Sequence, residues 1–221
     1  MADRAKGLPV AWEGVPFILG SGGMTFGSWL AGWGWPTCFL GLVSIFVVWF
    51  FRNPARTIPT GEGTVVSPGD GVVVAIESEF EHRFLKEPAL RISIFLNVFN
   101  VHINRMPIGG IVERIIYQPG QFMAANKPGA STGNEQNALI LQRADGAKVL
   151  CIQIAGLIAR RIVCWAVPGE SVEKGERFGL IRFGSRMDVY LPQTSVIRVK
   201  VGDKVKGGSS IIAELPPAEG L

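Results

Sequence analysis

The segment "GERFGLIRFGSRMDVYLP", residues 175–192, begins with a glycine and continues as two strand-like stretches separated by a second glycine and a serine. Similar stretches of alternating polar and apolar residues, bounded by Gly and Pro, fill the chain after residue 56, for example "TVVSPGDGVVVAIE", "RISIFLNVF" and "KVLCIQIAG". Alternation with period two and turn residues at short intervals are typical of strands joined by tight turns. The sequence therefore predicts a mostly β (α+β) fold with a compact β-sheet or barrel-like domain.

An internal echo links this segment to the C-terminal part of the chain. "GESVEKGERFGLI" from Gly169 and "GDKVKGGSSIIAEL" from Gly202 share the spacing G-x-x-V-x-x-G followed by a strand. The pattern is a tight glycine turn that leads into an extended strand, as in hairpins of the lipoyl and biotinyl type. Ser209 matches Glu176 in this alignment, and Glu176 has no hydroxyl group, so we interpret "GGSS" as a scaffold turn and not as a reactive site.

Length, charge and cysteine content narrow the class of protein. The 221 residues are enough for one substantial core plus an appendage. The net charge of +4 is modest and the basic residues are dispersed, which argues against nucleic-acid binding and fits an anionic membrane surface better. The three cysteines form no C-x-x-C pair, so neither a disulfide framework nor a zinc site is expected, and a reducing compartment fits.

The N-terminal quarter has a different composition. From Gly14 to Phe51 there is no Asp, Glu, Lys or Arg, and "GWGWP" (residues 32–36) interrupts the apolar run. One straight helix over this run would be far longer than the ~30 Å hydrocarbon core of a bilayer. We therefore predict a helical membrane hairpin with one arm over residues 15–31 and the other over residues 36–51.

Basic residues flank this hairpin, at Arg4 and Lys6 before it and at Arg52 and Arg56 after it. Positive flanks favour the cytoplasmic side, so both ends are expected there. A secretory signal peptide is the weaker interpretation because the run is too long and has no clean cleavage site before Arg52. A re-entrant or interfacial hairpin stays open because each arm is near the lower length limit for a membrane-spanning helix.

Few side chains qualify for acid–base chemistry, since the chain has two histidines. His82 lies in the charged stretch "EFEHRFLKEP" and is interpreted as solvated. His102 lies in "NVFNVHINRMP", and alone it is more often a structural histidine than a catalytic one. Asp70 lies in the turn "SPGDGVV", where turn capping is the ordinary role. Beside a histidine, this carboxylate would orient the ring so that one nitrogen takes a proton from a serine hydroxyl.

The serine after Gly184 admits two chemistries. A hydrolase is expected to show G-x-S-x-G at a strand-to-helix elbow, but "FGSRMDVYLP" continues as a strand. In self-processing the serine attacks the carbonyl of the residue before it, and a glycine there tolerates the strained backbone. The strand favours self-processing at Gly184–Ser185.

Six segments in order resemble the phosphatidylserine decarboxylase family in its short, membrane-anchored form: "FFRNPARTIP", "SPGDGVV", "NVFNVHINRMP", "GNEQN", "QIAGLIARRIVCW" and "GERFGLIRFGSRMDVYLP". Members of that family are made as inactive precursors that cut themselves at a Gly-Ser bond, usually within LGST, and convert the serine into a pyruvoyl group. The resemblance implies cleavage at Gly184–Ser185, a β chain of residues 1–184 and an α chain of residues 185–221. It also implies a covalent pyruvoyl cofactor derived from Ser185, and no metal.

The activity that the resemblance implies is decarboxylation of phosphatidylserine to phosphatidylethanolamine, with the pyruvoyl group as electron sink. Asp70 matches the aspartate that supports self-cleavage in the family, and His102 matches the histidine tied to decarboxylation. Longer members carry a second histidine where this chain has Arg105, so the base for self-cleavage is left open. Basic residues near the membrane surface are candidates for the lipid phosphate: Arg52, Arg56, Arg160, Arg161 and Arg186.

These interpretations divide the chain into a membrane anchor at 1–56 and a catalytic domain at 57–221. The expected partners are a membrane phospholipid and the chain's own two fragments as a heterodimer, with a further homo-oligomer left open and no nucleic acid. The expected location is the cell (inner) membrane, with the catalytic domain on the cytoplasmic face. Two other classes stay open: a lipoyl- or biotinyl-like carrier module, although the chain has neither M-K-M nor D-K-A, and a membrane serine peptidase that uses His102 and Asp70 in a triad.

Overall fold

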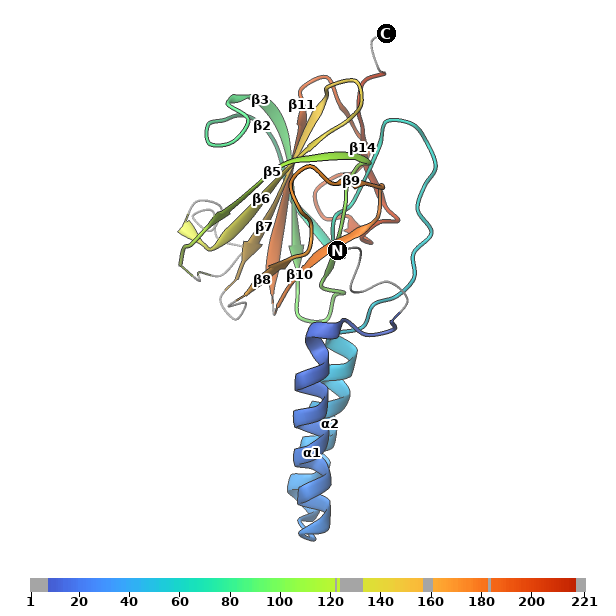
Figure 1. Cartoon of the computed structure of the whole chain (residues 1–221), viewed down its shortest axis with the longest axis vertical. Coiled ribbons are helices and arrows are strands. Elements are labelled where there is room, and N and C mark those ends of the chain that lie inside the picture. The colour runs from blue at the N-terminus through green and yellow to red at the C-terminus, as the bar shows by residue number, and fades with distance from the viewer. Residues whose placement is uncertain (1–7, 122, 124–132, 157–160, 183, 218–221) are drawn as a thin grey trace. The chain divides into compact units, whose positions relative to one another are not determined.

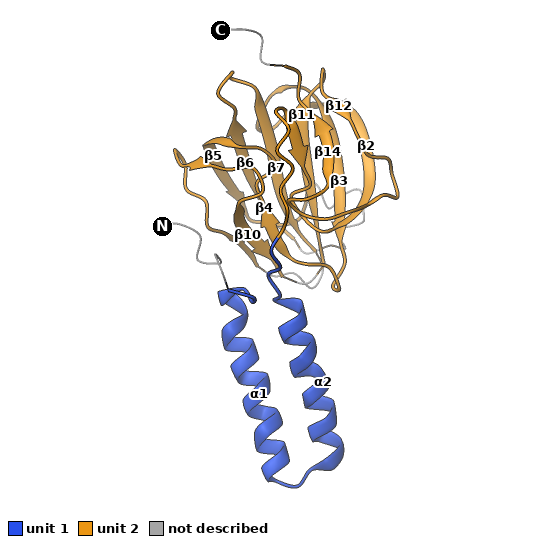
Figure 2. Cartoon of the chain, turned by 90° about the vertical axis from the view of Figure 1, so that its right-hand side faces the viewer, with its two compact units in different colours: residues 1–55 blue, residues 56–221 orange. Residues whose placement is uncertain are grey.

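The computed structural model describes residues 8–121, 123, 133–156, 161–182 and 184–217. The chain divides into two compact units, residues 1–55 and residues 56–221 (Figure 2). This boundary lies one residue before the predicted one. Arg56 belongs with the second unit, where its guanidinium forms an ion pair with Asp70.

The first unit is a helical hairpin, as predicted. It begins with the 3-10 turn η1 (Trp12–Gly14), and its helices are α1 (Val15–Leu30) and α2 (Gly34–Phe50). The turn between the helices contains Gly32, whose φ of 72° is favourable for a residue without a Cβ. The predicted arms therefore end within two residues of the observed helices.

Hydroxyl side chains join α1 to α2. The hydroxyl of Thr25 hydrogen bonds with that of Ser44 (3.0 Å), and the hydroxyl of Ser28 with that of Thr37 (2.9 Å). No helix in the described part of the chain is both long enough and apolar enough to cross a membrane. Large apolar side chains of the hairpin lie exposed: Phe26, Trp29, Leu30, Trp33, Trp35, Phe39, Leu42 and Ile45.

The second unit is built from strands, which confirms the mostly β prediction. In the described part of the chain they form an eight-stranded sheet of order β13-β2-β3-β11-β7-β6-β5-β9 and three-stranded sheets of order β1-β14-β12 and β4-β10-β8, all with antiparallel pairing (Figure 1). The strands are β1 (Thr64–Val66), β2 (Gly71–Glu81), β3 (Glu87–Leu96), β4 (Ile103–Arg105), β5 (Gly110–Gln118), β6 (Gln136–Gln142), β7 (Lys148–Ala155), β8 (Ile162–Cys164), β9 (Ser171–Val172), β10 (Arg177–Ile181), β11 (Ser185–Pro192), β12 (Val196–Ile197), β13 (Lys204–Val205) and β14 (Ile211–Glu214).

The two faces of the eight-stranded sheet enter different apolar clusters. On β11, Met187 and Val189 belong to the main core, whereas Tyr190 belongs to a smaller cluster on the other face. The main core also contains Phe178 from β10, so it extends from the large sheet to a small one. Because side chains alternate along a strand, Ser185 at the start of β11 faces this main core.

The second unit contains the same strand motif twice. Read from its two ends, the large sheet matches β13 with β9, β2 with β5, β3 with β6 and β11 with β7. The small sheets likewise match β1 with β4, β14 with β10 and β12 with β8. The registers agree, since Gly71 pairs with Val205 in one copy and Gly110 pairs with Val172 in the other. Each copy also carries a β-bulge two residues after that glycine.

One copy is inserted into the other. The second copy, β4 to β10, is one continuous segment, whereas the first copy is split into β1 to β3 and β11 to β14. The chain leaves the first copy after Leu96 and returns to it at Ser185, and these two residues pair in the sheet. The ends of the inserted copy also meet, because the N–H of Ile181 donates to the carbonyl of His102 (3.4 Å). The insertion therefore brings His102 and Ser185 to one end of the sheet.

The predicted echo is part of this repeat. Gly169 and Gly202 have φ values of 85° and 96°, and Gly175 and Gly208 both have a φ of 77°. In the "GGSS" turn, the N–H of Ser209 donates to the carbonyl of residue 206 (3.1 Å). The structure thus confirms that "GGSS" forms a turn.

Replacement of Gly175 by Ala should destabilise the protein more than replacement of Gly169. Both residues have a positive φ, which costs a residue with a Cβ about 1–2 kcal/mol. A Cβ on Gly175 would also lie 2.4 Å from Cδ1 of Ile58, whereas a Cβ on Gly169 would meet nothing within 4 Å. We expect urea titration to show that the free energy of unfolding falls by about 2–4 kcal/mol for Gly175→Ala and about 1–2 kcal/mol for Gly169→Ala. Equal losses would contradict this steric explanation.

Candidate functional site

Ser185 lies at the junction where the chain returns from the inserted copy. It is the first residue of β11 and pairs with Leu96 on β3 and with Ala155 on β7. Its side chain is fully buried, and its Oγ has no hydrogen-bond partner among the described residues. Gly184 before it has a φ of 69°, in the left-handed region that favours glycine. A buried, unbonded hydroxyl therefore directly follows a peptide that a larger residue would strain.

His102 lies at the other junction of the insertion. It directly precedes β4 and is buried, with both ring nitrogens shielded from solvent. Its carbonyl accepts the N–H of Ile181, which is four residues before Ser185 in the chain. His82, in contrast, is exposed and lies against the ring of Phe80, so its interpretation as a solvated residue is confirmed.

A hydrogen bond between two amide side chains joins the large sheet to the small sheet that contains β4. Nε2 of Gln153 donates to Oδ1 of Asn104 (2.8 Å). Gln153 lies two residues before Ala155, the partner of Ser185, and Asn104 lies two residues after His102. Side chains two residues apart lie on the same face of a strand. His102 and Ser185 therefore face the same interior as Asn104 and Gln153, one pair of residues closer to the end of the sheet. The sequence analysis missed both amides, because only tertiary structure brings them together.

Asp70 lies in the turn before β2, and both of its oxygens accept hydrogen bonds. Oδ2 accepts from Nη2 of Arg56 (2.7 Å) and Oδ1 accepts from the N–H of Gly207 (2.8 Å). Strand β2 is separated from β11 by β3 alone, so at the usual strand spacing the Asp70 and Ser185 backbones are roughly 10 Å apart. Asp70 therefore lies at the same end of the sheet as Ser185, in an ion pair with Arg56.

Arg105 occupies the position at which longer members of the resembled family carry their second histidine. Its N–H donates to the carbonyl of Pro68 in the Asp70 turn (2.8 Å), and its Nη1 donates to the carbonyl of Gly175 (2.9 Å). A Cβ on Gly208 would lie 2.7 Å from its Cδ, so the buried side chain packs against both glycine turns. Arg105 therefore joins these turns. It cannot act as a base, because a guanidinium stays protonated at ordinary pH.

Arg186, a predicted phosphate ligand, is paired with an acidic side chain on its own strand. Its guanidinium forms two parallel bonds with Asp188, Nε to Oδ1 and Nη2 to Oδ2, both of 2.7 Å. Both side chains are buried. This bidentate pair gives Arg186 a structural partner, and its role as a phosphate ligand stays a prediction.

The other predicted phosphate ligands have different surroundings. Arg56 is engaged with Asp70, and Arg52 lies over the ring of Trp49, 4.1 Å from its centroid. Arg161 is exposed to solvent. Residue 160 lies outside the described residues. Of the predicted ligands that the structure describes in the second unit, Arg161 is the exposed one.

The cysteines of the second unit offer no thiolate. Burial raises the pKa of the Cys151 thiol far above its usual range, and it also raises the pKa of Cys164. A thiol acts as nucleophile or metal ligand in its ionised form, so both cysteines are inert packing residues. Within the described ranges, no group of three or more His, Cys, Asp or Glu side chains could hold a metal ion.

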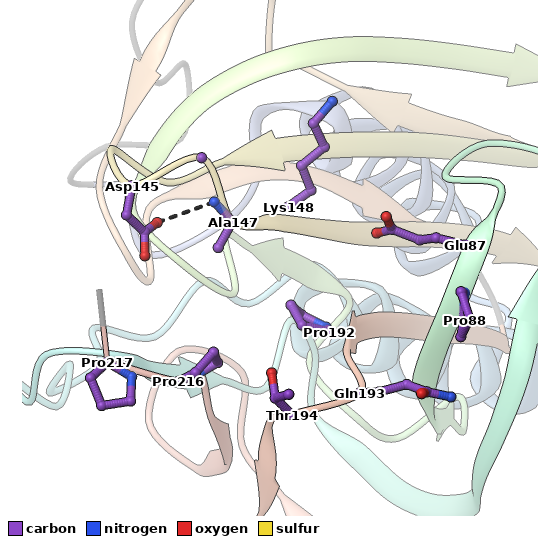
Figure 3. Close-up of a pocket in the computed structure, with 11 residues that line it drawn as sticks. Glu87, Pro88, Asp145, Ala147, Lys148, Pro192, Gln193, Thr194, Pro216 and Pro217 are labelled. Carbon is purple, nitrogen blue, oxygen red and sulfur yellow. Dashed lines mark hydrogen bonds between the residues drawn. The ribbon is translucent and has the colours of Figure 1, made fainter. Parts of the chain in front are cut away.

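A pocket of about 770 Å³ lies at the end of β7 opposite to Ser185, among side chains that include Lys148, Gln193 and Pro216 (Figure 3). The matched registers make Val149 of the inserted copy equivalent to Met187, so Ala147 in this pocket is equivalent to Ser185. The pocket is thus the counterpart of the Ser185 end, with a methyl group in place of the hydroxyl.

Comparisons with known proteins agree with the motifs quoted above. A sequence model of the family described as Phosphatidylserine decarboxylase matches residues 43–213. A phosphatidylserine decarboxylase proenzyme of Syntrophus aciditrophicus is 48% identical over 202 residues, which cover 91% of this chain and 95% of that protein. The proenzyme of Geotalea uraniireducens is 47% identical over 213 residues (96% and 100%), and that of Nitrosomonas eutropha is 48% identical over 206 residues (93% and 94%). At this identity and coverage, the chain belongs to the phosphatidylserine decarboxylase family.

Proposed function

We propose that the chain is a proenzyme that cuts itself at Gly184–Ser185 and then decarboxylates phosphatidylserine to phosphatidylethanolamine. The observation that carries this proposal is Ser185 itself, a buried hydroxyl without a partner among the described residues, directly after a left-handed glycine. The relatives are named proenzymes, which supports a precursor that is cut.

Self-cleavage begins when Oγ of Ser185 attacks the carbonyl carbon of Gly184. The peptide C–N bond breaks, the amine takes a proton, and residue 184 becomes an ester of the serine hydroxyl. Removal of the α-proton of residue 185 then expels the residue 184 carboxylate and leaves dehydroalanine, which water converts to a pyruvoyl group with loss of ammonia. The products are residues 1–184 and residues 185–221.

His102 is the group that we assign to proton transfer at this bond. Its burial keeps water from competing for the proton, and its carbonyl bond to Ile181 holds it near the cleavage segment. Asp70 supports the site less directly. Through Arg56 and Gly207 it fixes the turn that Arg105 joins to the histidine strand.

A pyruvoyl group at position 185 fits the interior of this site. The position faces the main core between Leu96 and Ala155, and the buried Oγ that the group would derive from has no partner in the described structure. Such a group would supply an electron sink for the electron pair released as CO2 leaves the substrate. The surrounding apolar side chains exclude water, and His102 supplies a proton at the carbon that loses CO2.

The helical hairpin is assigned to membrane attachment on the cytoplasmic face. Its exposed apolar side chains, such as Phe39 and Leu42, favour an apolar environment over water. A substrate with two acyl chains stays in the bilayer, so an enzyme held at the interface meets its head group there. The exposed Arg161 is assigned to the lipid phosphate.

Ser185→Ala should accumulate as an uncut, inactive precursor, because the substitution removes the attacking hydroxyl. Ser209→Ala should be cut normally, because Ser209 lies in a scaffold turn. Denaturing mass spectrometry of the purified wild-type protein should show residues 1–184 and a second fragment that begins with a pyruvoyl group at position 185. Cleavage of Ser185→Ala, or its loss in Ser209→Ala, would contradict the assigned site.

The same spectra separate the other two classes. A lipoyl- or biotinyl-like carrier would give an intact chain with a modified lysine. A serine peptidase would give an intact, unmodified chain. Neither result is compatible with a self-processing decarboxylase.

Asp70→Asn should slow self-cleavage about tenfold or more, because it removes the charge that holds Arg56 and the adjoining turn. Glu214→Gln is the matched control, since it makes the same acid-to-amide change in the exposed ion pair with Arg198 (2.6 Å). The precursor fraction over time, read from a denaturing gel, measures both rates. Equal rates in the two variants would remove Asp70 from the mechanism.

Lysine in place of Leu42 and Ile45 in the full chain should abolish co-flotation with vesicles of anionic phospholipid. These side chains are 67% and 68% exposed, and the charge would oppose their burial in lipid. Val201→Lys is the control, because Val201 is 58% exposed but lies in the second unit. Unchanged flotation of the hairpin variant would contradict attachment through the hairpin.

A further inference from the structure

The repeat in the second unit gives the sheet two equivalent ends. The end that carries Ser185, here called the reactive end, can be compared with the end that carries Ala147. At the reactive end, a chain of amides crosses the interior. Nδ2 of Asn137 donates to Oε1 of Gln153 (2.9 Å), and Nε2 of Gln153 donates to Oδ1 of Asn104 (2.8 Å). Asn137 is 3% exposed, and the other two side chains are fully buried.

The equivalent positions at the other end are apolar. Leu191 pairs with Leu90 in the first copy where Gln153 pairs with Asn137 in the inserted copy. In the same way Val65 pairs with Ala213 where Asn104 pairs with Gly179. The equivalents Leu191 and Val65 lie in the main core, and the partly buried Leu90 packs against it. The fold therefore accepts hydrocarbon at these positions and does not itself require the amides.

Buried amides are costly unless they are fully hydrogen bonded. Nδ2 of Asn104 is buried and has no acceptor among the described residues. Oγ of Ser185, on the adjoining row of the interior, has no partner among them either. A donor and a nucleophile thus lie unsatisfied at the same end of the sheet. A fixed N–H without an acceptor at rest is the arrangement that stabilises negative charge when it develops on a nearby oxygen.

Gly179 leaves the space that this amide contact needs. A Cβ at Gly179 would lie 3.1 Å from Nε2 of Gln153 and 2.1 Å from the carbonyl oxygen of Val163. The small sheet therefore approaches the large one closely enough for Gln153 to reach Asn104. The contact fixes the Asn104 side chain, which lies two residues along the strand from His102.

We propose that Asn104, held by Gln153, donates a hydrogen bond from Nδ2 to the carbonyl oxygen of Gly184 during self-cleavage. As Oγ of Ser185 bonds to the carbonyl carbon, the π electrons move to that oxygen and the hydroxyl proton moves to the base. The Asn104 N–H stabilises the resulting negative charge. The oxygen then re-forms the carbonyl as the C–N bond breaks, and the leaving amine takes the proton. This inference rests on the proposed cleavage at Gly184–Ser185.

The test follows self-cleavage of freshly translated full-length precursor by mass spectrometry. Asn104→Val installs the residue of the other copy, and the triple variant Asn104→Val, Gln153→Leu, Asn137→Leu installs its whole apolar set. We expect both variants to be cut on the order of 100 to 1,000 times more slowly than the wild type, the usual effect of losing one oxyanion donor. The melting temperature of the triple variant should be no lower than that of the wild type.

Val65→Ala is the matched control, since it truncates the equivalent position of the other copy. It should lower the melting temperature and leave the cleavage rate unchanged. A folded triple variant that is cut within threefold of the wild-type rate would overturn the inference. So would a rate loss in Val65→Ala as large as that in Asn104→Val, because stability alone would then explain both. A wild-type chain left uncut at Gly184–Ser185 would instead refute the proposed function.

Discussion

The pairing of Leu96 with Ser185 is the constraint on which the site depends. The first copy of the motif must close its sheet between β3 and β11, although the whole inserted copy separates these strands in sequence. The end of β3 and the start of β11 therefore lie side by side, and the inserted copy must begin and end beside them. The hydrogen bond between Ile181 and His102 closes the insertion at its base. The proximity of the histidine to the serine thus follows from backbone pairing and needs no side-chain contact of its own.

The two copies agree at residues that shape the fold and differ at the residues that we assign to catalysis. The glycine turns, the bulges and the registers are the same in both. By the same registers, Ser185, His102 and Asp70 correspond to Ala147, Gly63 and Gly109. Gly63 keeps the backbone role of His102, since its carbonyl accepts the N–H of Leu215 (2.8 Å). The side chains that we assign to catalysis occur at one end, on a backbone that the other end forms without them.

Much of this fold could be predicted from local sequence. Alternation and turn residues predicted the strands, the uncharged run from Gly14 to Phe51 predicted the helical hairpin, and the echo predicted paired glycine turns. The insertion could not be predicted, because strand partners such as β3 and β11 are distant in sequence and alternation does not identify the partner. The ion pair of Arg186 could not be predicted for a related reason. A sequence shows an arginine near a reactive bond, but not that Asp188, two residues later on the same face, already binds it.

The position of the proposed cleavage bond is compatible with a fold that persists after the cut. The strand that begins at Ser185 lies in the middle of the eight-stranded sheet, between β3 and β7, and pairs with both from its first residue. Its side chains Met187, Val189 and Leu191 are fully buried in the main core. A cut before Ser185 removes one covalent link at a junction between copies, where Gly184 already departs from strand geometry, and leaves the pairing of β11 from Arg186 onward in place. A cut within β4 or β10 would instead open the hydrogen bonds that hold His102. At this junction the peptide bond contributes little to the fold, while Ser185 after it is held by strand pairing on both sides.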